Sequence, residues 1–242
     1  MPKKYLNKNV LEATKERISI AFNEFERIIV SFSGGKDSTV MLHLVMDEAI
    51  KRNRKVAIMF IDLEGQYDYT IKHINECFEL YKDNIEPYWI CLPLHLRNAV
   101  SVYETHWLSW DKDKKEAWIK ELPKLAINDE SFFPFFKKGM EFEEFDVLFA
   151  EWYSQNKNTA VFVGIRADES LNRFRTIANK KKKNYKGYMW TTKVTEHTYN
   201  IYPIYDWKTR DDWIYVAKFP DKPYNRLYDI MHQAGLTIHQ MR

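Results

Sequence analysis

The 242-residue sequence contains 37 lysines and arginines and 34 aspartates and glutamates, which gives a formal net charge of +3. This small positive excess does not by itself indicate a nucleic-acid partner. Apolar residues make up 45% of the chain, enough for a core, and no apolar run approaches the length of a transmembrane helix. The composition therefore excludes a membrane-spanning protein and predicts a soluble one without a membrane partner.

The cysteines and the first residues indicate the expected compartment. Cys77 and Cys91 are the only cysteines, and their spacing is not that of a close pair of metal ligands. We expect both to be buried thiols in a reducing compartment, and we predict a cytoplasmic protein without a protein-bound metal. Residues 1–5 are basic but lack the apolar block of a signal peptide.

The first part of the chain predicts a helix, a strand and a second helix. Apolar side chains recur with helical spacing over residues 9–25, and Asn9 is a candidate N-cap. Residues 28–32 predict a buried strand, which a glycine-containing loop connects to an amphipathic helix. Residues 56–61 form a second continuous apolar run, as expected of a parallel strand that is covered on both faces.

The rest of the chain continues this alternation. Residues 67–81 have helical periodicity, residues 88–92 predict a third strand, and residues 159–165 predict a fourth after a long insertion. Strands that alternate with helices predict an α/β fold with a doubly wound parallel sheet and right-handed crossovers. We expect a single domain over residues 1–242, with an aromatic-rich helical insertion at about residues 99–157.

The loop after the first predicted strand is the most informative feature of the sequence. Gly34 and Gly35 carry no Cβ and tolerate positive φ angles, so their backbone can approach an anion closely. Lys36 adds a positive charge, and the following helix adds unpaired N–H groups and the positive end of its dipole. The predicted phosphate-binding residues are Ser31, Ser33, Gly34, Gly35, Lys36, Asp37 and Ser38.

This loop differs from the Walker A loop of kinases and GTPases. A Walker A loop has a further glycine upstream of a Gly-Lys-Ser/Thr triplet. Here Asp37 follows Lys36, and no glycine precedes Gly34. The sequence therefore disfavours a magnesium-bridged γ-phosphate mechanism. A bare Gly-Gly-Lys also occurs in ordinary strand-to-helix turns, but the complete string favours phosphate binding.

Polar residues also follow the other predicted strands. Ligands of doubly wound sheets bind at the carboxyl ends of the strands. Asp62 and Gly65 follow the second strand, and Arg97 lies after the third. These residues are candidates for a site that holds a charged nucleotide. The alternative is that they belong to ordinary polar loops, and this alternative is strongest for Arg97.

A second informative string, residues 164–173, follows the fourth predicted strand. Arg166 and Arg173 offer planar, bidentate donors that can bracket an anion. Glu169 can orient one of these arginines or meet a ribose hydroxyl. The alternative is an ion-pair network at a helix start, where the dipole favours Asp168 and Glu169.

Together these strings resemble the PP-loop adenine-nucleotide enzymes, most closely the phosphoadenosine phosphosulfate (PAPS) reductase family. The likeness covers nearly the whole chain outside the insertion. It rests on residues 33–38, 61–65, 164–173, 202–207, 212–213 and 224–228. The extended loop and its flanks are also similar to an uncharacterised branch of the family found in bacteria and their mobile elements.

The resemblance implies a Rossmann-like fold of the adenine nucleotide alpha hydrolase type and a role for each motif. The loop at residues 33–38 would hold the phosphates of ATP or of an adenylyl sulfate, with Mg²⁺ as a compatible cation. Asp62 and Gly65 would line the adenosine pocket, and Arg166 and Arg173 would approach the sulfate or phosphate end. The expected catalytic residues are Lys36, Asp37, Arg166 and Arg173, and Gly164 and Glu169 join the expected nucleotide-binding residues.

The cysteine pattern departs from that of the reductases. PAPS reductases carry a nucleophilic cysteine in a C-terminal tail, whereas this chain has no cysteine after Cys91. These residues therefore lack the thiolate that reductive desulfation needs. Either a cysteine-bearing tail lies beyond Arg242, or the protein performs adenylyl or pyrophosphate chemistry without a thiol. We favour the second alternative.

Two further segments suggest partners. The aromatic residues of the insertion, including Trp110 and Trp118 on one expected helical face, predict a helical subdomain with a small core of its own. The alternative is an aromatic surface for a second copy, a partner protein or nucleic-acid bases. The lysine run at residues 180–183 is expected to be a solvated loop beside the active site, with nucleic-acid phosphate contacts as the alternative.

Functions from two classes therefore stay open. The preferred one is an enzyme, a nucleotide α-phosphate hydrolase or transferase that acts on ATP or a related adenylyl nucleotide. The other is a nucleotide-sensing or DNA-associated regulatory module that binds without turnover. PAPS reduction is a third possibility if a cysteine-bearing tail exists. The sequence does not name the acceptor.

Overall fold

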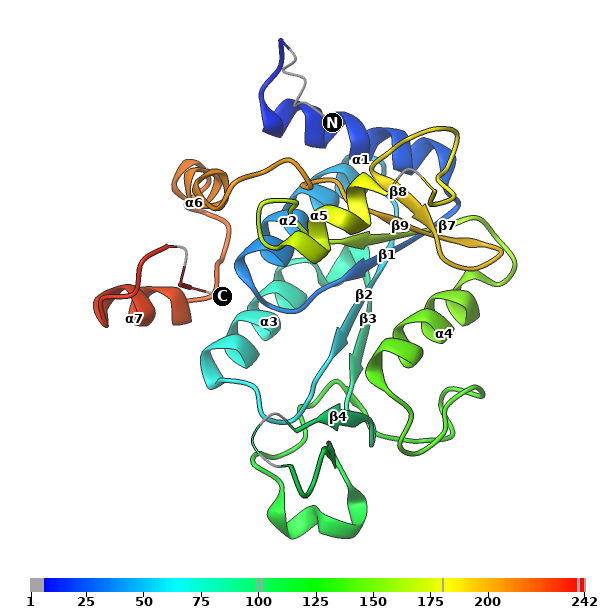
Figure 1. Cartoon of the computed structure of the whole chain (residues 1–242), viewed down its shortest axis with the longest axis vertical. Coiled ribbons are helices and arrows are strands. Elements are labelled where there is room, and N and C mark those ends of the chain that lie inside the picture. The colour runs from blue at the N-terminus through cyan, green and yellow to red at the C-terminus, as the bar shows by residue number, and fades with distance from the viewer. Residues whose placement is uncertain (1–6, 99, 101, 180, 239, 242) are drawn as a thin grey trace.

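The central feature of the computed structural model, which describes residues 7–98, 100, 102–179, 181–238 and 240–241, is a seven-stranded sheet (Figure 1). Its strand order is β6-β3-β2-β1-β7-β9-β8. The parallel strands are β1 (Arg27–Ser31), β2 (Val56–Ile61), β3 (Ile85–Ile90), β6 (Ala126–Ile127), β7 (Thr159–Val163) and β9 (Thr198–Ile201). At one edge, β8 (Thr191–Lys193) runs antiparallel to β9. The predicted α/β class with a doubly wound, mostly parallel sheet is confirmed.

The helices are α1 (Val10–Glu24), α2 (Lys36–Lys51), α3 (Asp68–Leu80), α4 (Phe142–Ser154), α5 (Leu171–Ala178), α6 (Thr209–Lys218) and α7 (Leu227–Gln233). Helix α1 precedes the sheet, α2 to α5 lie between its strands, and α6 and α7 follow the last strand. The predicted cap of α1 is confirmed, because Asn9 Oδ1 accepts a hydrogen bond of 2.9 Å from the N–H of Glu12. Within the described ranges, no helix is both long enough and apolar enough to span a bilayer.

Helices cover both faces of the sheet. Successive side chains of a strand point to opposite faces, so Ile28 and Val30 of β1 pack with Phe22 of α1 and with residues of α2 and α3. Ile29, between them, packs with Phe149 of α4 on the other face. Figure 1 shows α2 and α3 on one side of the strands and α4 on the other. Each fully buried side chain of this size stabilises the fold by about 1.5–3 kcal/mol.

The insertion does not have the separate core that we expected. Phe133, Phe145 and Phe149 share one hydrophobic cluster with Ile29 and Met59 of the sheet. The α-helix of this segment, α4, is thus a layer of the main domain, because a parallel sheet needs cover on its second face.

The two tryptophans of the insertion are also placed differently from the prediction. The rings of Trp110 and Trp118 lie 5.2 Å apart, edge to face, on either side of a 3-10 segment (Lys112–Ala117). They are therefore neighbours without sharing one α-helical face, which corrects the expected helical spacing. Trp110 is fully buried in the cluster that includes the α2 and α3 residues.

The sheet changes direction at β1. From β1 the chain builds outward through β2 and β3, and it returns on the other side of β1 with β7. Ser31 at the end of β1 pairs with Val163 at the end of β7. The glycine loop and the segment from Gly164 onward therefore leave the sheet side by side, at the topological switch point where such folds bind ligands.

Two buried histidines connect α2 to its surroundings. Nε2–H of His43 donates to the carbonyl oxygen of Pro223 at 2.8 Å, which leaves Nδ1 to accept from the hydroxyl of Tyr81 at 2.7 Å. His73 Nε2 lies 2.8 Å from Thr39 Oγ1. Burial lowers the pKa of His43 to about 4 and the pKa of His73 to about 3.

These two pKa values predict a loss of stability in mild acid. Below about pH 6.5 each histidine is protonated in the unfolded chain but stays neutral in the folded one, so protons favour unfolding. We expect each histidine to lower the free energy of unfolding by about 2 kcal/mol between pH 7 and pH 5. Urea unfolding at both pH values measures this loss. His43→Gln should reduce the loss of stability between the two pH values. His106→Gln, which replaces an exposed histidine, is the control and should leave this loss unchanged. Equal losses in the two variants would contradict the prediction.

Candidate functional site

The glycine loop is held by residues from distant parts of the chain. Gly34 has a φ of +74°, and a Cβ at this position would lie 2.9 Å from Cγ2 of Thr70 in the first turn of α3. Asn225 Nδ2 donates to the carbonyl oxygen of Gly34 and to Oγ1 of Thr70, both at 3.0 Å. A glycine is therefore required at this position by both its backbone conformation and its surroundings.

Helix α2 begins directly after the loop and points its N-terminus at the site. Its N-cap is Gly35, which has no side chain with which to cap the helix. The N–H of Lys36 donates to the Tyr228 hydroxyl at 3.1 Å, and Ser38 Oγ donates to the carbonyl oxygen of Gly35 at 3.0 Å. Ser33 is exposed at the loop surface. Helix N-termini of this kind can bind anions, and phosphate binding by this loop stays a prediction.

Four charged side chains gather beneath the loop. Lys36 Nζ lies 3.1 Å from Oδ2 of Asp37, and Arg166 Nε is ion-paired with Oδ1 of the same carboxylate. Arg166 Nε also lies 3.4 Å from Oδ2 of Asp212, which α6 contributes. Arg166 is 2% exposed and Asp212 is fully buried. The fold thus brings together three of the four predicted catalytic residues and adds Asp212.

The two carboxyl groups of this cluster titrate in opposite directions. Burial alone would raise the pKa of Asp37, but the interaction with Asp212 and the charges of Lys36 and Arg166 outweigh burial and lower it. Burial and the neighbouring Asp37 charge raise the pKa of Asp212 well above its usual range, which favours its neutral form at pH 7. Neither carboxyl oxygen of Asp212 has a hydrogen-bond partner among the described residues.

This protonation state leaves the cluster with a net charge of +1, from Lys36, Arg166 and the Asp37 carboxylate. Nη1 of Arg166 is buried and has no hydrogen-bond partner among the described residues. A buried guanidinium N–H without a partner is costly. Both features suit an anionic ligand.

Gly164 allows the exit of β7 to lie against the start of α2. A Cβ on Gly164 would lie 2.9 Å from Cα and 3.0 Å from N of Ser38. These are backbone atoms, so no side-chain movement could make room. The predicted importance of Gly164 thus has a steric basis in the close approach of two chain segments.

Arg173 has its ion pair with Glu169 and not with the carboxylates of the charged cluster. It is on α5, its side chain is 40% exposed, and its Nε lies 3.0 Å from Oε2 of Glu169. This geometry matches the ion-pair network at a helix start that we considered as the alternative. The predicted roles of Glu169 toward a nucleotide and of Arg173 toward an anion stay predictions.

The end of β2 is tied to the insertion. Oδ2 of Asp62 accepts from Trp89 Nε1 and Oδ1 accepts from Lys120 Nζ, both at 3.0 Å. Oε2 of Glu64 accepts from the N–H of Trp110 at 2.7 Å. The sequence did not reveal this anchoring role of Asp62, whose oxygens are engaged within the protein. The predicted nucleotide contacts of Asp62 and of the exposed Gly65 stay predictions.

Comparison with known proteins identifies the family. A model of the phosphoadenosine phosphosulfate reductase domain matches residues 27–233. This range includes the glycine loop, the charged cluster, and Asn225 and Tyr228, which contact the loop. The chain belongs to the PAPS reductase family. Within this family, it is 44% identical over 237 residues to the uncharacterised protein YbdN of Escherichia coli K12, covering 97% of this chain. The chain spans 58% of the length of that relative.

Solved structures confirm the fold expected of a PAPS reductase family member. The phosphoadenylyl-sulfate reductase of Candida auris superimposes with a TM-score of 0.51 and 14% identity, over 95% of this chain and 94% of that one. The FMN adenylyltransferase of Candida glabrata, in complex with FAD and pyrophosphate, superimposes with a TM-score of 0.52 and 16% identity. This superposition covers 90% of this chain and 59% of that one. The predicted Rossmann-like fold of the adenine nucleotide alpha hydrolase type is therefore confirmed.

The thiols of this PAPS reductase family member are inaccessible. Cys77 and Cys91 are both fully buried, as predicted, and burial raises the pKa of each thiol above its ordinary value. A reductase activity would therefore need a thiol from outside these 242 residues. In the described part of the chain, no three His, Cys, Asp or Glu side chains are grouped to hold a metal ion.

The lysine run follows α5 in this fold. Lys181 and Lys183 are exposed, and Lys182 Nζ donates to the carbonyl oxygen of Thr176 at 3.3 Å. Lys180 lies outside the described residues, as do residues 1–5 and Arg242. Contacts of this run with nucleic acid stay a prediction.

Proposed function

We propose that this protein binds ATP or a related adenylyl nucleotide at the glycine loop and cleaves or transfers at its α-phosphate. The observation that carries this proposal is the assembly of Lys36, Asp37 and Arg166 beneath the loop at the switch point between β1 and β7. The FMN adenylyltransferase with bound FAD and pyrophosphate supports it, because a protein of the same fold is named for adenylyl transfer.

The chain's own residues can supply the required electrostatics. The loop backbone and the start of α2 bind phosphate oxygens, and Lys36 and the unpaired Nη1 of Arg166 stabilise negative charge that develops on the α-phosphate and on the leaving pyrophosphate. One preorganised donor of this kind contributes about 3 kcal/mol to the transition state. Mg²⁺ would enter with the nucleotide as its counterion, because both oxygens of Asp37 are already paired with Lys36 and Arg166.

A Lys36→Ala variant tests the proposal. With ATP labelled at the α-phosphate, and with Mg²⁺, we expect the wild type to release AMP and pyrophosphate or to form an adenylylated product. Lys36→Ala should bind ATP about ten- to a hundredfold more weakly, because it removes a charged donor. Lys181→Ala, which removes an exposed lysine, should behave like the wild type.

The outcomes separate the candidate functions. No turnover by the wild type, together with unchanged ATP binding by Lys36→Ala, would contradict the proposed enzyme. ATP binding that depends on Lys36 but leads to no product would instead support a nucleotide-sensing module. Equilibrium dialysis for binding and thin-layer chromatography for products give both measurements.

A further inference from the structure

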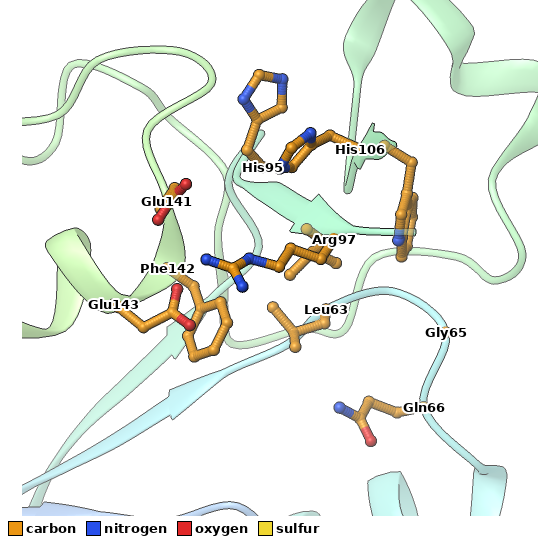
Figure 2. A pocket seen from close by; sticks show the side chains of 11 residues that line it. Leu63, Gly65, Gln66, His95, Arg97, His106, Glu141, Phe142 and Glu143 are labelled. Carbon is orange, nitrogen blue, oxygen red and sulfur yellow. The ribbon is translucent and has the colours of Figure 1, made fainter. Parts of the chain in front are cut away.

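A separate cavity of about 360 Å³ lies beside the end of β2 (Figure 2). Three segments form its walls. They are the β2–α3 connection, the paired strands β4 (His95–Arg97) and β5 (His106–Leu108), and the start of α4. Its volume is within the usual range of small-molecule sites.

The cavity adjoins the predicted nucleotide site. Gly65 and Gln66 line it, and the same connection leads into α3, whose first-turn residue Thr70 packs against Gly34. In the sheet, β2 lies next to β1, so the β2–α3 connection stands between the cavity and the glycine loop. A molecule in the cavity would therefore lie at the same carboxyl edge as the nucleotide.

Backbone hydrogen bonds hold the walls in place. The N–H of His95 donates to the carbonyl oxygen of Met140 at 3.0 Å, and the N–H of Gly139 donates to that of Pro93 at 2.9 Å. These bonds attach β4 to the segment that leads into α4. The cavity is thus preformed, which lowers the cost of ordering a ligand.

Charges of both signs face one another across this cavity. Figure 2 shows the Arg97 side chain extending toward Glu143, with Glu141 close by. None of the three has an ion pair or a side-chain hydrogen bond with another residue of the described ranges. Glu143 is in the first turn of α4, where the helix dipole stabilises a carboxylate.

The remaining walls combine apolar side chains with the polar side chains of Gln66, His95 and His106. Trp107, Phe142 and Leu63 line the cavity alongside the charged groups. Aromatic walls alone would also suit a nucleic-acid base. Two carboxylates in the same cavity repel a phosphodiester backbone, however, so a free small molecule fits better than a nucleic acid.

We infer that this cavity binds an amino acid, with its α-carboxylate on Arg97, its ammonium on Glu141 and Glu143, and an apolar side chain against Trp107 and Phe142. The inference rests on the proposed function and deepens it: an amino acid held at the same carboxyl edge as the nucleotide would be the second substrate.

Saturation-transfer NMR tests binding independently of turnover. The probes are the proteinogenic amino acids, each also as its methyl ester and its N-acetyl form, which remove one charge at a time. We expect saturation transfer from the protein to apolar or aromatic amino acids. The wild type should bind the methyl esters and N-acetyl forms at least about tenfold more weakly than the free amino acids, and Arg97→Gln should bind the free amino acids at least about tenfold more weakly than the wild type does. Arg210→Gln, which removes an exposed arginine of α6, is the matched control.

The results separate this inference from the proposed function. Lys36→Ala should lose ATP binding but keep amino-acid binding. Arg97→Gln should lose amino-acid binding but keep ATP binding. Three results would overturn the inference: no saturation transfer to any amino acid, undiminished saturation transfer to amino acids in Arg97→Gln, or saturation transfer to nucleosides alone. None of these results depends on whether ATP is bound or cleaved.

Discussion

Replacement of Arg166 by methionine is expected to lower the free energy of unfolding by about 3–5 kcal/mol, because it leaves buried carboxyl groups without their guanidinium partner. Arg166 is ion-paired with Asp37, and its Nε lies 3.4 Å from Oδ2 of Asp212. Arg166 is almost fully buried and Asp212 is fully buried. The same change removes Nη1, the buried donor that we assign to the substrate. We therefore also expect the loss of any α-phosphate chemistry.

Urea unfolding of Arg166→Met beside Arg173→Met measures the stability effect. Arg173 also pairs with a carboxylate, that of Glu169, but its side chain is 40% exposed, and exposed pairs contribute about 0–1 kcal/mol. Equal losses in the two variants would contradict the buried cluster.

Asp212→Asn provides a second control. Because the pKa of Asp212 is raised, this carboxyl group is already neutral at pH 7 when the protein is folded. A carboxyl group whose pKa is raised in the folded state stabilises the fold at low pH, and this contribution is lost as the pH rises. Between pH 6 and pH 8 the free energy of unfolding of Asp212→Asn should therefore decline less steeply than that of the wild type. An unchanged slope would show that Asp212 is ionised in the folded protein.

Local patterns in the sequence were sufficient to predict the frame of the fold. Continuous apolar runs gave the residues of β2 and of most of β1 and β7, and helical spacing gave α1 and α3 to within a residue or two at each end. The glycine loop was recognisable because a strand, two glycines and a helix are adjacent in sequence. These signals are local, so they survive without knowledge of the tertiary structure.

The supports of the site could not be predicted in the same way. Tyr228 and Asn225 contact the loop across 192 and 191 residues of sequence. Their strings contributed to the family resemblance, but nothing near them in the sequence indicates what they touch. Asp212 likewise gains its neutral state only from burial beside Asp37. Such roles arise from the fold and not from local composition.

The insertion was misjudged although the sequence held a relevant signal. Strands that are apolar on both faces need cover on both faces. The second face, which includes Ile29, Met59 and Ile90, is covered by Phe145 and Phe149 of α4. The aromatic side chains of the segment were therefore the expected partners of that face, and no separate core was required.

Gly164→Ala is expected to destabilise the protein by about 1–3 kcal/mol, which is the usual cost of forcing an extra methyl group into a packed site. The added Cβ would lie 2.9 Å from Cα of Ser38, at the first turn of α2. The loop and the helix start must then move relative to β7, and a displacement of about 1 Å can lower a catalytic rate about a hundredfold. ATP binding should weaken in parallel, because the anion site is built from this turn.

The matched control for this substitution is Gly65→Ala. The nearest atom to a Cβ at Gly65 is Cδ1 of Ile119 at 3.8 Å, an ordinary contact, so the stability of this variant should equal or slightly exceed that of the wild type. Thermal unfolding of both variants gives the comparison of stability. Indistinguishable behaviour of the two alanine variants would mean that β7 and α2 do not approach as closely as the structure shows.

A second substitution at the contact separates a steric cause from a loss of hydrogen bonding. The atoms of Ser38 nearest to the added methyl group are backbone N and Cα, not Oγ. Ser38→Ala in the Gly164→Ala background should therefore leave the loss of stability in place, since it removes a hydroxyl that does not clash. Recovery of stability would show that the Ser38 side chain, with its bonds to Gly35 and to the N–H of Ser33, was the strained group instead. The backbone contact at Gly164 thus connects the second motif to the first, because only a residue without a side chain at this position lets Arg166 reach Asp37 beside the glycine loop.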